Sequence, residues 1–278
     1  MKPDRIRRID NVMSGRAQDL PARLARTGLR SLEPVYRTIT VLRNRSWDTR
    51  QDRVHRVSVP VISIGNLTTG GTGKTPLVRY VASRLLRQNQ QPAIVSRGYG
   101  SQPGRPNDEF LELKMWLPDT PHLQNPDRVA AARVAIDEHR ASVIVLDDGF
   151  QHRRLGRDLD IVLVDATCPF GYDHLLPRGL LREPVSSLQR ADAVVVTRVN
   201  QVEGDEVERI RKRIVQHVAE DRIATVSFDP GPWLDLDGRQ LEQKLDEPDI
   251  GFCGIGNPAG FRLSLDKLCS AIADFRSY

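Results

Sequence analysis

The sequence predicts an α/β fold in which helices cover both faces of a mostly parallel sheet. From residue 57 onward, short segments rich in valine and isoleucine alternate with segments of helical periodicity. These apolar segments are nearly continuous, which is typical of strands buried on both faces. The chain has 278 residues, of which 39% are hydrophobic and 28% charged. This length allows a large core, and the composition argues against a disordered or fibrous protein.

The expected elements follow one another in a regular order. Gly, Ser, Pro and Gln fill most of residues 98–106, which predicts a mobile surface loop. Asp237-Gly238 is a strong turn dipeptide and predicts a β-hairpin over residues 233–241. We divide the chain into an N-terminal segment (1–56), a sheet domain (57–228) and a small C-terminal lobe (229–278). Strands are predicted at 59–64, 93–95, 143–146, 161–164, 193–196, 223–228 and 250–253, and helices at 77–86, 129–136, 202–218 and after 258.

The N-terminal segment carries the net charge of +5. Residues 1–58 hold 14 Lys or Arg against 6 Asp or Glu, so the remainder is slightly acidic. Apolar residues recur at helical spacing over residues 20–42 with arginines between them, which predicts one basic amphipathic helix, or two helices broken near Pro34. Such a helix either packs on the domain or lies on an anionic membrane surface. No nucleic-acid-binding motif accompanies the arginines, which disfavours DNA or RNA as a partner.

Cysteine usage and hydropathy exclude other classes. The three cysteines have no CxxC spacing, which argues against a disulfide framework or a cysteine-rich zinc site and fits a reducing cytosol. We expect no transmembrane helix, because no stretch is long and apolar enough. The N-terminal residues also lack the apolar region of a secretory signal.

A Gly/Thr-rich loop joins the first predicted strand to the next helix. It fits the P-loop pattern G-x-x-x-x-G-K-T except that Thr68 stands at the first glycine. In a P-loop, backbone N–H groups hold phosphate oxygens, the lysine reaches the β- and γ-phosphates, and the Thr hydroxyl holds Mg²⁺. The alternative is a glycine-rich turn that binds nothing. The candidate nucleotide-binding residues are Thr68, Thr69, Gly70, Gly71, Thr72, Gly73, Lys74 and Thr75.

A pair of aspartates follows another buried strand. Asp147 and Asp148 come directly after four apolar residues, where the end of a parallel strand would bring them beside the phosphate loop. Adjacent carboxylates repel one another unless a cation lies near them, so the pair is a candidate Mg²⁺ site together with Thr75. The alternative is an aspartate pair that caps the following turn. His152, a few residues later, is a candidate neighbour of this site.

Five segments in the same order resemble the tetraacyldisaccharide 4'-kinase family. Members phosphorylate the 4'-hydroxyl of a tetraacylated glucosamine disaccharide 1-phosphate in lipid A biosynthesis. Their P-loop is similar to this one in lacking the first glycine. The segments are VPVISIGNLTTGGTGKTP (59–76), SRGYG (96–100), DDGFQHRRL (147–155), LPRGLLREP (176–184) and GIGNP (254–258).

The resemblance implies a P-loop kinase that uses ATP and Mg²⁺. Lys74 would bind the β- and γ-phosphates, and Thr75 with Asp147 or Asp148 would hold the metal. The family has a general base in a Gly-Asp-Glu context, and Asn107-Asp108-Glu109 is the matching segment, so Asp108 is the candidate base. An ordinary loop or helix-cap carboxylate is the alternative.

The resemblance also implies contacts with the acceptor and with a membrane. Arg97, His152 and Arg182 are candidate substrate contacts, with surface salt bridges as the alternative for the two arginines. The partners would be the lipid disaccharide and an anionic membrane surface, with the protein peripheral on the cytoplasmic face of the inner membrane. The oligomeric state and the acyl-chain specificity stay open.

The resemblance carries one departure. The family continues beyond Gly-Ile-Gly-Asn-Pro with a helix, a strand and an Asp-His-His segment. Because this chain ends at Tyr278, we expect it to lack the Asp-His-His segment and most of the small C-terminal lobe. An incomplete C-terminal lobe of this kind would leave ATP binding intact and slow phosphate transfer. The alternatives to an active kinase are therefore a nucleotide-binding membrane-associated protein with weak or no kinase activity, and a soluble P-loop ATPase.

Overall fold

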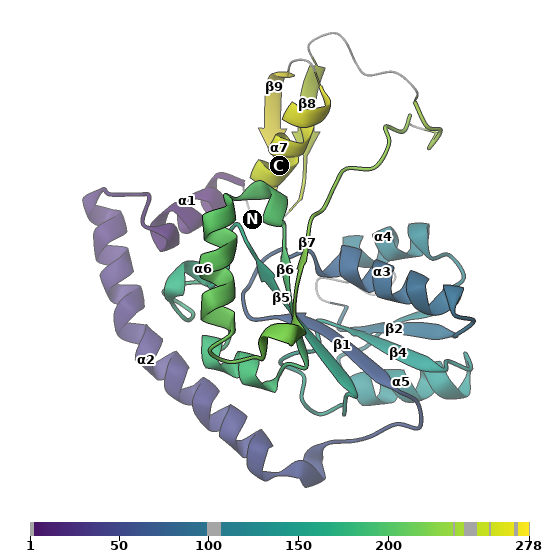
Figure 1. Cartoon of the computed structure of the whole chain (residues 1–278). Coiled ribbons are helices and arrows are strands. Elements are labelled where there is room, and N and C mark those ends of the chain that lie inside the picture. Colours follow the sequence, from purple (N-terminus) through teal and green to yellow (C-terminus); the bar gives the residue numbers. More distant parts are fainter. Residues whose placement is uncertain are drawn as a thin grey trace.

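The protein is built on a seven-stranded parallel sheet in the order β3-β2-β4-β1-β5-β6-β7. The computed structural model describes residues 3–98, 107–235, 237–241, 249–255, 257–269 and 272–277. The expected parallel α/β fold is confirmed (Figure 1). Its strands are β1 (Val61–Asn66), β2 (Pro92–Ser96), β3 (His122–Gln124), β4 (Val143–Asp147), β5 (Leu159–Asp165), β6 (Ala193–Thr197) and β7 (Ile223–Val226).

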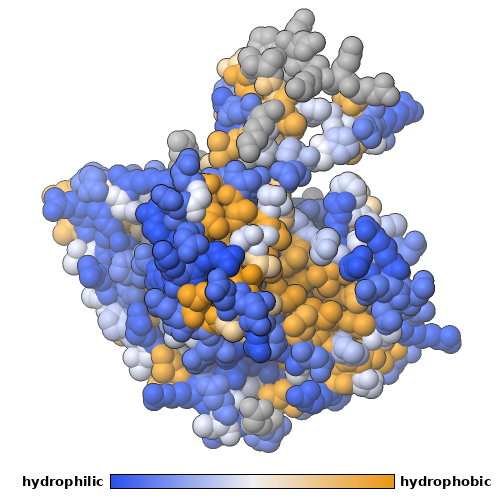
Figure 2. Space-filling model, viewed as in Figure 1, coloured by the Kyte–Doolittle hydropathy of each residue, from blue (hydrophilic) through white to orange (hydrophobic). Residues whose placement is uncertain are grey.

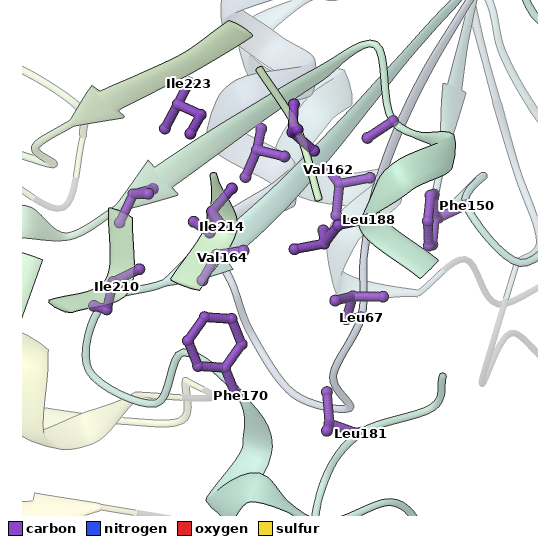
Figure 3. Close-up of a cluster of buried hydrophobic side chains, with 14 of the residues drawn as sticks. Leu67, Phe150, Val162, Val164, Phe170, Leu181, Leu188, Ile210, Ile214 and Ile223 are labelled. Carbon is purple, nitrogen blue, oxygen red and sulfur yellow. The ribbon is translucent and has the colours of Figure 1, made fainter. Parts of the chain in front are cut away.

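Helices cover both faces of the sheet. Side chains of α3 (Lys74–Arg87) and α4 (Asp108–Trp116) pack on one face with Ile64, Ile94 and Val145. On the other face, α5 (Arg128–Asp137) packs on Ile144 and Leu146. The same face carries α6 (Gly204–Ile214) and the 3-10 turn η3 (Val185–Arg190), whose side chains join those of β5 and β6 in the cluster drawn in Figure 3. In Figure 2, apolar side chains are visible between α6 and α3 on a face that is otherwise largely hydrophilic.

Two helices precede the sheet. α1 (Pro3–Ser14) is followed by α2 (Leu20–Thr49), which runs unbroken through Pro34. The alternative of two helices broken near Pro34 was therefore wrong, and the helical structure is interrupted between α1 and α2 instead. Proline removes one helical hydrogen bond, but Glu33 and Tyr36 on either side of it are held by the sheet domain. These tertiary contacts keep the helix intact.

A small unit follows the sheet. Leu234 and Gln240 pair antiparallel, and Gly238 has φ +80° at the turn, which confirms the hairpin at Asp237-Gly238. β8 (Asp249–Cys253) and β9 (Ile272–Ser277) are parallel neighbours joined through α7 (Pro258–Leu268). The predicted loop at 98–106 lies outside the described residues, apart from Gly98. The elements α1, α4, β3 and β9 were not expected from the sequence.

Candidate nucleotide-binding site

The glycine-rich loop connects β1 to α3, as the sequence predicted. It leaves the sheet after Asn66, and α3 begins at Lys74. Gly70 and Gly73 have φ angles of +112° and +85°, a region that side chains disfavour. A Cβ on Gly73 would stand 2.4 Å from the ring of Phe228. Glycine at position 73 thus permits both the turn and the close approach of the segment after β7.

Lys74 lies at the centre of the polar groups around this loop. Its Nζ is 3.4 Å from Oδ1 of Asn66 and 3.7 Å from Oδ1 of Asp148. The side chain is only 15% exposed. The ammonium is therefore held between the end of β1 and the end of β4, at the mouth of the loop.

Arg182 completes this cluster from far along the chain. Its guanidinium donates to both carboxylate oxygens of Asp148, at 2.8 and 3.0 Å, and to the backbone oxygen of Asn66 at 3.1 Å. Asp148 itself adopts a left-handed conformation, with φ 52°. Burial acts to raise the pKa of Asp148, but the hydrogen bonds and charge of Arg182, with the charge of Lys74, outweigh it and lower that pKa. Asp148 is ionised at neutral pH.

Asp147 has the opposite electrostatic character. It is 3% exposed, and burial raises the pKa of its carboxyl to about 7. Lys74 opposes this shift, whereas the charges of Glu109 and Asp148 add to it. Its Oδ1 is buried and has no hydrogen-bond partner within the described part of the chain. Asp147 is thus a buried hydrogen-bond acceptor, and a cation bound beside it would compensate the negative charge of its carboxylate.

The segment Asn107-Asp108-Glu109 forms the N-terminus of α4. Oδ1 of Asn107 accepts from the N–H of Phe110 at 3.0 Å and from Nε2 of Gln124 at 2.8 Å. Asp108 and Glu109 are exposed in the first turn, where carboxylates are favoured by the helix dipole. The charge of Glu109 contributes to the raised pKa of Asp147. Sequence reasoning singled out Asp108 and missed Glu109, although the two are adjacent.

Arg128 and Arg97 form a second group of cations, and the charges of Asp147 and Asp148 act on Arg128. Arg128 is 6% exposed at the start of α5, and burial lowers the pKa of its guanidinium, with a further contribution from the charge of Arg97. Arg97 follows β2 and is exposed. Burial and the charge of Arg128 lower the pKa of His152 to about 4, so its imidazole is neutral at pH 7. Arg128 was missed, because nothing in its sequence context distinguishes it.

The threonines at the start of the loop have structural partners. Thr68 pairs with Leu181, and the N–H of Thr69 donates to the oxygen of Leu180 at 2.8 Å. Farther along, Thr72 is buried and its backbone oxygen accepts from Oγ1 of Thr197 at 3.0 Å. These contacts therefore hold the loop at Thr68 and Thr69 and again at Thr72, on either side of Gly70 and Gly71.

Comparison with known proteins places this site in context. A model of the family described as LpxK, tetraacyldisaccharide-1-P 4'-kinase, matches residues 25–278. A tetraacyldisaccharide 4'-kinase of Halothermothrix orenii is 35% identical in an alignment of 265 residues, and the alignment covers 84% of this chain and 69% of that one. A second, of Syntrophus aciditrophicus, is 37% identical in an alignment of 274 residues, and the alignment covers 87% of this chain and 72% of that one.

A solved structure has the same architecture. The crystal structure of LpxK from Aquifex aeolicus in complex with ATP aligns with a TM-score of 0.71 at 30% sequence identity. The alignment covers 91% of this chain and 82% of that one. The range matched by the family model includes the whole sheet domain. This chain belongs to the tetraacyldisaccharide-1-P 4'-kinase family.

Proposed function

We propose that this protein transfers the γ-phosphoryl group of ATP to the 4'-hydroxyl of a tetraacylated disaccharide 1-phosphate. The observation that carries the proposal is the placement of Lys74 between Asn66 and Asp148 at the mouth of the glycine-rich loop, in a chain of this kinase family. Phosphoryl transfer depends mainly on positioning and on neutralising charge. The backbone of the glycine-rich loop and the ammonium of Lys74 would do this for the triphosphate.

The residues fit a magnesium ion. Mg²⁺ is usually bound through one or two carboxylates together with substrate phosphates. Asp147 and Asp148 offer two carboxylates, and the hydroxyl of Thr75, the residue after Lys74 in α3, would be a third ligand. Among the described residues there is no larger group of His, Cys, Asp and Glu placed for a metal. The buried Oδ1 of Asp147, which has no hydrogen-bond partner among the described residues, is the observation that favours the cation. Mg²⁺, when bound, would neutralise charge on the β- and γ-phosphate oxygens.

Asp108 is the proposed general base for the acceptor hydroxyl. It stands in the exposed first turn of α4, whose neighbour Glu109 acts electrically on Asp147. Asp108→Asn should lower turnover by roughly 10²-fold or more, which is the usual scale of a lost proton acceptor. The affinity for ATP should not change. Asp119→Asn, an exposed carboxylate beyond the same helix, serves as the matched control. Normal turnover of Asp108→Asn would assign the proton transfer to another group.

The apolar face of α2 is the proposed membrane contact. None of the helices in the described ranges combines the length and apolarity that a membrane span requires. α2 docks on the sheet domain through Glu33 and Thr40, which are buried. Six apolar residues outside this buried side of the helix are 55–68% exposed, and they are Leu20, Leu24, Leu32, Val35, Ile39 and Leu42.

This arrangement is the reverse of the usual one for a surface helix, whose apolar face turns inward. Exposed arginines such as Arg23, Arg30 and Arg37 lie along the same helix. An apolar face flanked by arginines fits an anionic interface. We place the protein peripherally on the cytoplasmic face of the inner membrane, where its lipid substrate would be anchored.

Flotation with anionic vesicles tests this placement. Ile39→Glu should weaken vesicle binding by roughly tenfold, because it removes one buried aliphatic side chain from the interface. Leu86→Glu makes the same change at an exposed position of α3 and should have no effect. Equal flotation of wild type and Ile39→Glu would show that α2 does not enter the interface.

The kinase assignment is tested by Lys74→Ala. Transfer of phosphate from ATP to the lipid disaccharide should fall by roughly 10²-fold or more, since the lysine stabilises charge on the transferred group. The thermal midpoint should stay close to that of wild type, because Lys74 lies at the loop mouth and not in the core. Lys212→Ala removes an exposed lysine of α6 and serves as the control. Unchanged turnover in Lys74→Ala would refute the assignment.

A further inference from the structure

The turn that follows the aspartate pair is held by the guanidinium of Arg157, which lies two residues before β5. Its Nη1 donates to the backbone oxygens of Gly149 and Phe150, at 3.1 and 3.5 Å. Its Nη2 donates to the oxygen of His152 at 2.6 Å, and Nη1 also donates to Oδ2 of Asp160 at 3.0 Å. The side chain of Arg157 is only 14% exposed. A rigid, planar guanidinium with five N–H donors suits such a set of oxygens.

Arg157 is itself anchored to the sheet. Its partner Asp160 lies in β5, is 4% exposed, and is the register neighbour of Ser63 in β1. The N–H of Asp160 donates to Oδ2 of Asp192 at 2.8 Å, which fixes the backbone at this position. The oxygens of the turn are therefore tied through one side chain to β5, the neighbour of the central strand β1.

The turn contains a residue that needs support from its surroundings. Asp148 has φ 52°, a left-handed conformation that residues with a side chain seldom adopt and that persists where neighbouring contacts impose it. The N–H of Gly149 donates to the oxygen of Ile64 at 3.2 Å, and the ring of Phe150 is buried in the core cluster (Figure 3). These contacts hold an N–H group and a side chain of the turn, whereas Arg157 holds its oxygens.

We propose that Arg157 is a positioning residue for the aspartate pair. By holding the oxygens on both sides of the turn, it keeps Asp148 in its left-handed conformation, with the carboxylate 3.7 Å from Nζ of Lys74. Partners of this kind, one step removed from a metal, change metal affinity or activity by about 10–100-fold. The inference rests on the proposed function in taking the pair as the magnesium site. The alternative is that Arg157 serves only to balance the buried charge of Asp160.

Titration of the full chain with Mn²⁺ in the absence of nucleotide, with the free ion measured by EPR, tests this role. Arg157→Gln should weaken Mn²⁺ binding by about tenfold or more, because the turn is no longer held. Arg157→Lys keeps the charge but not the fork of donors, so its affinity should fall between those of Arg157→Gln and wild type.

A remote core substitution controls for lost stability. Ile223→Val shortens a buried side chain at the start of β7, the edge strand, which three strands separate from β4. It should lower the thermal midpoint and leave Mn²⁺ binding unchanged. If Arg157→Gln also lowers the midpoint but binds Mn²⁺ as wild type does, Arg157 only balances Asp160 and the proposal is overturned. If wild type binds no Mn²⁺, the aspartate pair is not a metal site and the inference fails with it.

Phosphate transfer from ATP gives a second readout. In Arg157→Gln, the Mg²⁺ concentration for half-maximal rate should rise by about tenfold or more, whereas the KM for ATP at saturating Mg²⁺ should change by less than about twofold, because the glycine-rich loop is untouched. Loss of Mn²⁺ binding in Arg157→Gln, with no phosphate transfer by wild type, would refute the kinase assignment and support this inference. Phosphate transfer with the same Mg²⁺ requirement in Arg157→Gln and wild type would refute this inference alone.

Discussion

Asp147→Asn should stabilise the metal-free protein and remove the proposed magnesium-dependent activity. Burial raises the pKa of Asp147 from its ordinary 3.8 to about 7. Each tenfold change in acidity corresponds to about 1.4 kcal/mol, so ionising this carboxyl at pH 8 costs the folded state about 4 kcal/mol. Asparagine has no charge to desolvate. Its buried amide still costs about 1–3 kcal/mol where it lacks partners, which leaves a gain of about 2 kcal/mol.

The pH dependence of this gain follows from the direction of the shift. Because the pKa of Asp147 is higher in the folded than in the unfolded chain, the folded state holds the proton more tightly. The cost is absent below about pH 4, grows as the pH rises towards 7, and is complete above that value. The gain from Asp147→Asn should therefore be large at pH 8 and small at pH 5.

Urea unfolding in the presence of EDTA at pH 8 and pH 5 measures this effect. Asp148→Asn is the matched control, because Arg182 holds Asp148 ionised, and removal of that charge should lower the free energy of unfolding. A gain that is equal at both pH values, or one that Asp148→Asn shares, would refute the reasoning. In the same variants, phosphate transfer should lose its response to Mg²⁺.

Three further predictions each concern one residue. Glu183→Gln should lower the free energy of unfolding, measured in urea, by about 3 kcal/mol, because the fully buried carboxylate pairs with Arg190 at 2.9 Å and Arg43 at 3.4 Å. The exposed Glu208→Gln should change this free energy by less than about 0.5 kcal/mol. Equal effects of the two substitutions would contradict the claim. Gly73→Ala should weaken Mg-ATP binding at least tenfold, since its Cβ meets Phe228, whereas Gly28→Ala, with open space around it, should bind normally. The ring nitrogens of His152 should show no titration in NMR between pH 6 and 8, because the pKa lies near 4, and a midpoint near 6.5 would show that the ring is solvated.

The fold was predictable where the hydrophobic pattern was strong. The valine-rich strands β4, β5 and β6 are buried on both faces, so their continuous apolar runs identify them. α4 gave no such signal, because Leu111, Met115 and Trp116 point to solvent while Leu113 is buried. The apolar residues of this helix therefore lie all round it and show no helical stripe. At Pro34, the local cost of proline was outweighed by tertiary contacts that the sequence does not reveal.

The site was predictable where one local motif contains the chemistry. Lys74 and the adjacent glycines follow from the loop pattern, and the structure places Asp148 within reach of Lys74. Asn66 was overlooked, although it ends β1 and its side chain contacts Lys74 and donates to the oxygen of Thr68 at 2.9 Å. The pairing of Arg182 with Asp148 spans 34 residues and depends on where the chain returns to the sheet. The separation of the two residues in the sequence does not predict that they are in contact.

The return of the chain at residues 175–183 also links the two regions that the proposed function requires. On one side, the N–H of Leu175 donates to Glu33 of α2 at 3.0 Å, and the hydroxyl of Tyr36 donates to the oxygen of Arg182 at 3.2 Å. On the other side, the oxygen of Leu180 accepts from the N–H of Thr69 at 2.8 Å, and the N–H of Arg182 donates to the oxygen of Leu67, at the start of the phosphate loop, at 2.7 Å. The phosphate loop is therefore joined to α2 by hydrogen bonds and not by a flexible linker. With the apolar face of α2 in a membrane surface, these bonds would fix the height of the nucleotide above that surface, where the acceptor hydroxyl of an anchored lipid has little freedom to move.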